Sequence, residues 1–261
     1  MISLDAAQLS AWLSAFLWPF FRILGLLGSA PLFAESTVPR RVKIVLAALL
    51  AVVVAPTLGN LPTVPVYSYA GLLVLAEEVG IGLAMGFSMR LVFATVQFAG
   101  ELIGLQMGLS FATFFDRSAG GQTMVLARLL NIVAMLLFLA MDGHLLMLAT
   151  LVDGFHALPV ATVPLAAPGW RQLASTGGTI FASGLLLALP MIAVLLTLNL
   201  CMGILNRSAP QLSIFAVGFP VTLAGGLLVL MLVMPQTGTY MRALIDHGLA
   251  TMQAVLGAFA G

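Results

Sequence analysis

Charged side chains are scarce in this chain of 261 residues, where Asp, Glu, Lys and Arg together make up 7%. A soluble domain carries about 25%. Hydrophobic residues account for 61% of the chain, so the polar groups are too few to cover a globule of this size in water. The composition excludes a soluble domain and predicts an integral membrane protein.

Basic surface and cysteine are also lacking. The formal net charge is +1, which leaves no basic face for nucleic acid. Cys201 is the only cysteine and sits in an apolar run, so it is expected to be a buried hydrophobe, and a disulfide or a thiolate metal cluster within the chain is excluded. Residues 1–8 carry a single charge, Asp5, so no secretory signal peptide is expected.

Motifs of catalysis are missing as well. The only lysine, Lys43, does not follow a glycine-rich turn, so there is no phosphate-binding loop. There is no Gly-x-Ser-x-Gly sequence, and His144, His156 and His247 lack the spacing of a metal-binding helix face. We therefore expect no catalytic, metal or cofactor site, and a protein that is not an enzyme.

Long apolar stretches dominate what is present. A membrane-spanning helix needs about 20 apolar residues, and we count six such stretches: residues 9–33, residues 42–58, one from residue 69, one from residue 123, residues 179–205, and one from residue 221. This predicts an all-α, polytopic membrane protein with about six long hydrophobic helices. Residues 69–110, 126–158 and 221–259 are too long for a simple crossing, the last being interrupted by Pro235. These segments are expected to tilt, bend, form hairpins or extend beyond the bilayer.

Glycine and charge share one face of the third stretch. At ~100° per residue, that face carries Glu78, Gly82, Gly86, Arg90, Gln97, Gly100, Glu101, Gly104 and Gly108. Three Gly-x-x-x-Gly spacings occur on it, which allow close helix packing in a membrane, either within the chain or between subunits. Because the charged members cannot face lipid, we predict a subunit interface or the wall of a conduit.

An aromatic segment follows this stretch. Phe111, Phe114 and Phe115 precede a glycine-rich turn. The segment is either an anchor at the membrane surface, although such anchors favour Trp and Tyr, or a plug that excludes water and ions. The plug candidates are Gly108, Ser110, Phe111, Phe114, Phe115, Asp116, Gly120 and Gly121.

The fourth stretch contains Asp142-Gly143-His144, with Asp153 and His156 further on. An Asp-Gly pair favours a turn. The alternative is a proton relay, since titratable groups at membrane depth are commonly functional.

Residues 198–220 read Leu-Asn-Leu-Cys-Met-Gly-Ile-Leu-Asn-Arg-Ser-Ala-Pro-Gln-Leu-Ser-Ile-Phe-Ala-Val-Gly-Phe-Pro. This stretch closely resembles the most distinctive segment of the FliR family of flagellar biosynthetic proteins. The matching positions are Asn206, Arg207, Pro210, Gln211, Phe215, Gly218 and Pro220. Residues 99–112 resemble the family's central helix, and residues 31–43 and 187–191 fit as well. An injectisome (SctT-like) homologue shares the architecture, but residues 206–220 favour the flagellar version.

The resemblance implies a core subunit of the flagellar type III protein export gate, in the bacterial inner (cytoplasmic) membrane at the flagellar basal body. It implies FliP-like and FliQ-like partners that enclose a narrow path for unfolded export substrates, beside FlhB-like and FlhA-like components. Residues 1–170 would be FliP-like and residues 171–261 a FliQ-like helical hairpin, within one membrane domain. Membrane lipid is an expected partner, and nucleic acid is not.

The family's closing plug matches residues 108–121, with the three phenylalanines as occluding groups. The chain departs from the family pattern at two places. Arg117 stands where the family commonly has Pro, and the family's Gly-Gly-His-like pattern is reduced to Asp142-Gly143-His144. A rival hypothesis is a secondary transporter or proton channel that uses Glu77, Glu78, Arg90, Glu101 and Asp142, although no internal repeat of the kind such folds show is apparent. A scaffold that nucleates the gate without touching substrate is a third reading.

Overall fold

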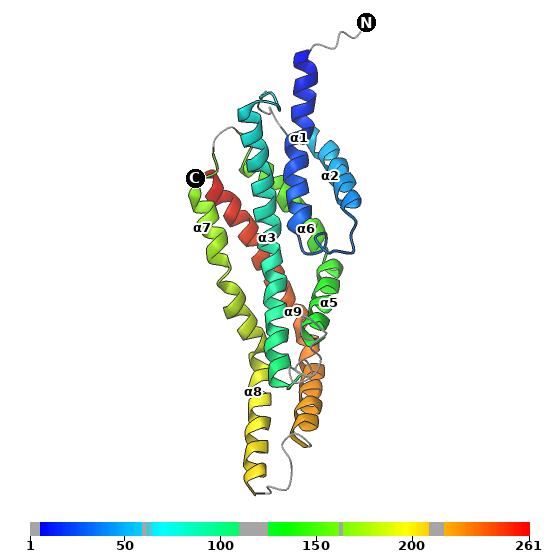
Figure 1. Ribbon diagram of the computed structural model, residues 1–261, viewed down its shortest axis with the longest axis vertical. Coiled ribbons are helices and arrows are strands. Elements are labelled where there is room, and N and C mark those ends of the chain that lie inside the picture. The colour runs from blue at the N-terminus through cyan, green and yellow to red at the C-terminus, as the bar shows by residue number, and fades with distance from the viewer. Residues whose placement is uncertain (1–5, 59–61, 63, 110–124, 162–163, 209–216) are drawn as a thin grey trace. The chain divides into compact units, whose positions relative to one another are not determined.

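The computed structural model describes residues 6–58, 62, 64–109, 125–161, 164–208 and 217–261, with side chains from residue 10 onward. Over these ranges the chain is helical and has no strand (Figure 1). The helices are α1 (Ala6–Ser29), α2 (Arg40–Val54), α3 (Tyr69–Gln106), α5 (Val125–Ala140), α6 (Gly143–Ala157), α7 (Ala167–Thr176), α8 (Thr179–Ser208) and α9 (Phe219–Ala260), with a short 3₁₀ turn at Ala55–Thr57. The predicted all-α membrane fold is confirmed.

Fewer helices can cross a membrane than the six apolar stretches suggest. The described chain has four that are long and apolar enough: Ser10–Ser29, Tyr69–Gln106, Ala167–Ser208 and Phe219–Ala260. Counting α5 and α6 as one broken span gives five. The second stretch falls short because α2 has only 15 residues, about 22 Å at ~1.5 Å per residue against a hydrocarbon layer of ~30 Å.

The Asp-Gly pair separates α5 from α6. Asp142 has a φ of 55°, in the left-handed region that Asp and Asn tolerate better than most residues. Its carbonyl oxygen accepts the backbone N–H groups of Leu145 and Leu146, at 2.9 and 3.0 Å, so it begins α6. The turn predicted at Asp142-Gly143 is confirmed.

Helix α3 has 38 residues without interruption. It begins after Ser68, whose hydroxyl oxygen accepts the N–H of Gly71 at 3.0 Å and so satisfies one unpaired amide of the first turn. It ends at Gln106, shortly before Gly108, which has a φ of 78°. The N–H of Leu109 reaches the carbonyl of Gly104 (3.0 Å) and that of Gly108 reaches Leu105 (3.1 Å), the pairing of a Schellman motif. Local signals thus define both ends of α3.

The expectation that Pro235 interrupts the last helix was wrong. Helix α9 has 42 residues in all and contains Pro235 in its interior. Proline removes one N–H donor from the helical ladder. Within a membrane such a loss is tolerated, since neighbouring groups and local adjustments of the helix compensate for it. Pro19 in α1 and Pro190 in α8 are accommodated in the same manner.

The chain divides into two compact units. Unit 1 comprises Met1–Leu91, Asp142–Gly177 and Ile245–Gly261, and unit 2 comprises Val92–Met141 and Gly178–Leu244. Each unit draws on segments far apart in the sequence. The FliP-like and FliQ-like division at residue 170 concerns likeness to other subunits and stays a prediction.

Each unit contains an edge-to-face contact between two aromatic rings. In unit 1 the rings of Trp170 and Phe259 meet edge to face with centroids 4.9 Å apart, and Phe259 packs with Ala84 and Val255. In unit 2 the rings of Phe93 and Phe138 make a similar contact at 5.5 Å. Such pairs add about 0.5–1.5 kcal/mol beyond the area they bury.

Within unit 2, α8 and α9 pair as an antiparallel hairpin. The hydroxyl of Tyr240 on α9 donates to the carbonyl of Ser183 on α8 at 3.1 Å. Gly225, nearer the start of α9, faces Leu198, nearer the end of α8. The contacts therefore run in opposite directions along the two helices.

Candidate functional site

Most of the predicted plug lies outside the described residues: Ser110, Phe111, Phe114, Phe115, Asp116, Gly120 and Gly121. Gly108 is described, and its left-handed conformation ends α3 immediately before this segment. Met107, 1% exposed, lies next to Gly226 of α9 in unit 2. The structure thus gives the position at which the chain leaves α3.

Gly82 and Gly86 of α3 pack against α1 inside unit 1. A Cβ on Gly82 would overlap the carbonyl oxygen of Arg22, and one on Gly86 would lie 2.7 Å from the carbonyl oxygen of Leu26. From the opposite side, a Cβ on Gly25 of α1 would lie 2.7 Å from the carbonyl oxygen of Val79. These distances are shorter than real Cβ contacts, so the two backbones approach as closely as they do because side chains are absent.

Gly100 makes a similar contact in unit 2. A Cβ there would lie 2.5 Å from the Cα of Ala127 on α5. Gly104, one turn further along α3, is also buried. Of the two readings of the glycine spacing, packing within the chain is what the structure shows for Gly82, Gly86 and Gly100.

Glu78 finds its partner inside unit 1. Its carboxylate accepts two hydrogen bonds from Arg22 of α1, from Nε at 2.6 Å and from Nη2 at 2.8 Å. Glu78 is 2% exposed and Arg22 is fully buried. Two parallel N–H···O bonds of this kind give the most specific geometry open to an arginine and a carboxylate.

Arg22 also binds the end of α6. Its Nη1 donates to the carbonyl oxygens of Gly154 (3.3 Å) and Leu158 (3.0 Å), and its guanidinium lies 4.2 Å from the centroid of the Phe155 ring. A cation at a helix C-terminus is stabilising, because it is attracted to the partial negative charge of the unpaired carbonyls. We call Arg22, Glu78 and these α6 contacts the arginine clamp, because they join α1, α3 and α6.

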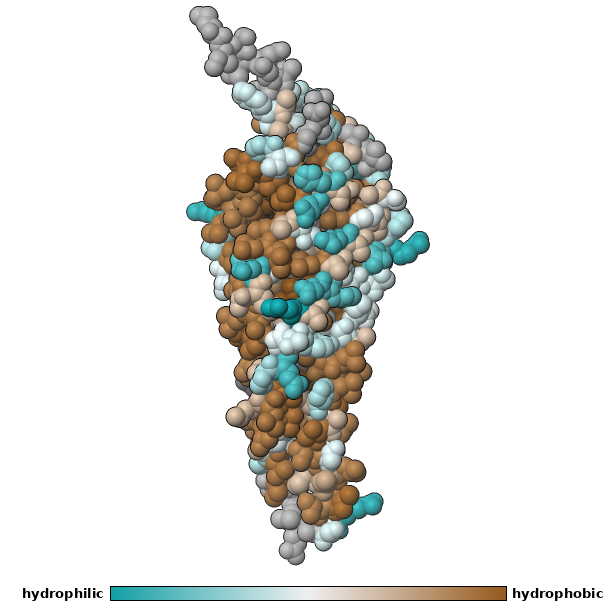
Figure 2. All heavy atoms as spheres, turned by 180° about the vertical axis from the view of Figure 1, so that it is seen from behind, coloured by the Kyte–Doolittle hydropathy of each residue, from teal (hydrophilic) through white to brown (hydrophobic). Residues whose placement is uncertain are grey.

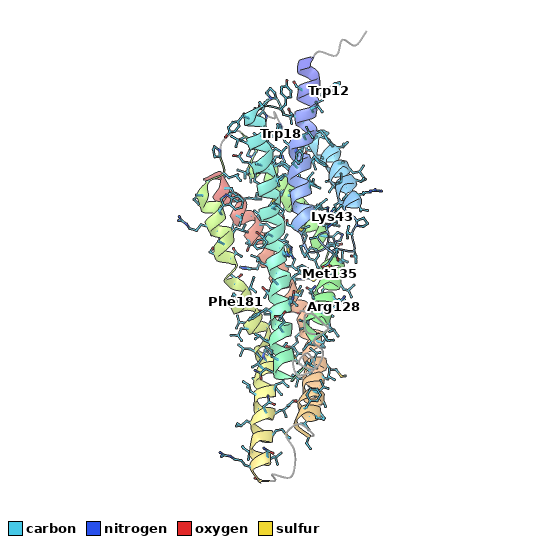
Figure 3. The ribbon with its side chains drawn as sticks, viewed as in Figure 1. Trp12, Trp18, Lys43, Arg128, Met135 and Phe181 are labelled. Atoms are coloured by element: carbon cyan, nitrogen blue, oxygen red, sulfur yellow. The ribbon has the colours of Figure 1, made fainter. Side chains whose placement is uncertain are left out.

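Arg22 was missed by the sequence analysis, which singled out Glu78 alone. The available signal was an arginine inside the first apolar stretch, since a charge there needs a partner. Trp18, one helical turn before it (Figure 3), is also fully buried, and its indole Nε1 has no hydrogen-bond partner among the residues that the structure describes.

The other polar residues of α3 that the sequence singled out are more accessible than Glu78. Gln97 donates from Nε2 to a carboxylate oxygen of Glu101 at 3.2 Å, and both side chains are partly exposed. Arg90 is exposed, and no ion pair involves it among the described residues. The residues of the transporter hypothesis lie in different environments. Glu78 is buried and paired with Arg22, whereas Asp142 is exposed at a turn.

The family-like stretch spans the α8–α9 connection. Asn206 and Arg207 belong to the last turn of α8, Gly218 is buried immediately before α9, and Pro220 is the second residue of that helix. Proline is well suited to a first helical turn, where its missing N–H would be unpaired in any case. Pro210, Gln211 and Phe215 lie outside the described residues.

An open apolar hollow of about 500 Å³ lies on the surface of α9 in the described part of unit 2, at Leu227, Leu230, Met231, Met234 and Pro235. An apolar cavity of about 30 Å³ lies in unit 2, bordered by Leu130, Met191, Thr237 and Tyr240 among others; this is about the share of liquid volume of one water molecule. Among the described residues, no three His, Cys, Asp or Glu side chains gather where they could hold a metal.

Comparison with known proteins identifies the chain. The family of bacterial export proteins, family 1, matches residues 13–248. The chain is 51% identical to the flagellar biosynthetic protein FliR of Pectobacterium carotovorum subsp. carotovorum and 46% identical to that of Escherichia coli (strain K12), in each case over 90% of both chains. It belongs to the FliR family of bacterial export proteins. A more distant FliR protein, from Bacillus subtilis (strain 168), is 29% identical over 93% of this chain and 94% of its own.

The FliR family assignment confirms the resemblance read from residues 198–220. The compared relatives are flagellar, in agreement with the preference for the flagellar version. The chain is therefore a helical membrane protein of a family of bacterial export proteins that serves flagellar biosynthesis.

Proposed function

We propose that the chain is a core subunit of the flagellar type III export gate in the bacterial inner membrane. It packs there with FliP-like and FliQ-like subunits, beside FlhB-like and FlhA-like components, around a gated conduit for unfolded export substrates. Its own role is to enclose and close the path, and the energy for export comes from partners.

The length of the apolar helices carries this proposal. At ~1.5 Å per residue, α3 is about 57 Å long and α9 about 63 Å, each roughly twice the ~30 Å of the hydrocarbon layer. Large apolar side chains are exposed on α3 at Leu72 and Leu105 and on α9 at Leu227 and Leu232, and apolar residues cover much of the face in Figure 2. Lipid covers only part of such a length, so other protein must cover the rest.

Co-purification tests the proposal. A tagged copy of the chain, extracted from its own membranes in mild detergent, is expected to elute as one particle with two other small hydrophobic proteins, to be identified by mass spectrometry. A tagged chain that elutes alone after extraction in several mild detergents would contradict the assembly.

The plug makes a separate prediction. Replacing Phe111, Phe114 and Phe115 together by Ala is expected to raise the ion conductance of the assembled gate in planar bilayers, because dewetting requires apolar bulk in the constriction. The matched control replaces the same three residues by Leu, which keeps the bulk and should leave conductance low. Equal conductance of the wild type and the triple Ala variant, with assembly intact, would remove the plug from the mechanism.

A further inference from the structure

An arginine with no ion-pair partner in the described ranges lies within the apolar helix α3. Arg90 is exposed, and on the same side of α3, one and two turns earlier, Phe87 and Leu83 are each 44% exposed. Leu83, Phe87 and Arg90 belong to unit 1. We call them the Arg90 stripe; their spacing of four and three residues is that of a surface that receives another helix.

Arg90 is far from both ends of its helix. At ~1.5 Å per residue it lies about 30 Å after the start of α3 and about 24 Å before its end. A charge within an apolar helix is costly toward lipid and normally meets water or a counter-charge. Its apolar neighbours Leu83 and Phe87 would exclude water once another helix covered them.

The buried carboxylate of α3 already has a partner. Glu78, the buried carboxylate of α3, is bound by Arg22. Among the described residues, no Asp or Glu oxygen comes within ion-pair distance of Arg90. The guanidinium therefore keeps donors that no carboxylate of the described residues takes up, and its planar fork matches a carboxylate with two parallel hydrogen bonds.

We propose that the Arg90 stripe docks an apolar helix of a neighbouring export subunit, and that this helix carries an Asp or Glu that pairs with Arg90. This inference rests on the proposed function, because it requires that other subunits assemble on the chain. The apolar residues supply contact area, whereas the ion pair sets the register of the two helices.

The experiment uses the tagged chain expressed with the other export proteins in cells, and measures the partner subunits retained per tagged chain after detergent extraction. R90Q and R90E should reduce retention at least about tenfold, since removing one member of a desolvated pair leaves the other buried without a partner. R90K should retain an intermediate amount, because ammonium does not form the fork. The matched control is R171Q: Arg171 is also exposed in unit 1, but lies in the middle of the short helix α7.

Folding is checked separately. Arg90 is exposed, and no ion pair involves it among the described residues, so the isolated R90Q and R171Q variants should have the same thermal midpoint as the wild type. In cells that carry R90E, selection for recovered motility should give substitutions of an Asp or Glu in a partner subunit by a neutral or basic residue, with retention restored.

The outcomes separate the two proposals. Wild type that retains no partner contradicts the proposed function. Wild type that retains partners while R90E retains them equally contradicts only the Arg90 pairing. Revertants confined to this chain would also overturn it. A lipid phosphate is the other possible source of negative charge, and it is tested by adding phosphatidylglycerol to complexes purified without anionic lipid. If the lipid restores partner retention and this effect depends on Arg90, the arginine binds a lipid phosphate and the carboxylate partner is overturned.

Discussion

Replacement of Arg22 by Ala is expected to lower the free energy of unfolding of the chain by about 3–5 kcal/mol, the range for removal of one partner of a buried ion pair. The variant leaves the Glu78 carboxylate in a core position without its two N–H donors. It also removes the Nη1 donor from the carbonyls of Gly154 and Leu158 at the end of α6. Three helices therefore lose their common contact at once.

The measurement is denaturant unfolding of the purified chain in mild detergent, followed by circular dichroism. R171A, which truncates an exposed arginine of α7, should change the free energy of unfolding by no more than about 0.5 kcal/mol. The double variant R22M/E78L should cost less than R22A, because replacing both members by apolar residues leaves no isolated charge. If R22A were no more destabilising than R171A, the arginine clamp would not hold the unit together.

Replacement of Gly82 by Ala is expected to destabilise the chain by about 1–3 kcal/mol, and replacement by Leu by more, because added atoms overpack a close helix contact. A Cβ at this position overlaps the carbonyl oxygen of Arg22. That oxygen belongs to the backbone of α1, so it cannot move aside as the end of a flexible side chain would. The helices must separate, and Arg22 is then drawn away from Glu78.

Gly28 provides the matched control. It lies on α1 with nothing within 4 Å of an added Cβ, so Gly28→Ala should be neutral or stabilise by up to about 1 kcal/mol through lower entropy of the unfolded chain. Thermal unfolding of both variants in one detergent gives the comparison. Equal midpoints for Gly82→Ala and Gly28→Ala would contradict close packing of α1 on α3.

Local patterns were enough to predict several features of the fold. The scarcity of charge predicted the membrane class, and the apolar run from Tyr69 predicted the long helix α3. The turn at Asp142-Gly143 followed from residue types that adopt left-handed backbone readily. The distinctive residues 198–220 indicated the FliR family. Each of these features depends on residues close together in the sequence. Their conformational preferences act independently of how distant segments pack.

Contacts between distant segments were decided by tertiary structure. Glycine spacing marked Gly82 and Gly100 as packing positions, but not that one meets α1 and the other α5. Proline chemistry alone suggested a break at Pro235, which the membrane helix tolerates. The pairing of Arg22 with Glu78 joins residues 56 positions apart. The sequence by itself determined which segments are helical and apolar, because helix formation and burial preference are local properties. Only the tertiary structure decided which charge meets which, because that depends on the directions in which separate helices pack.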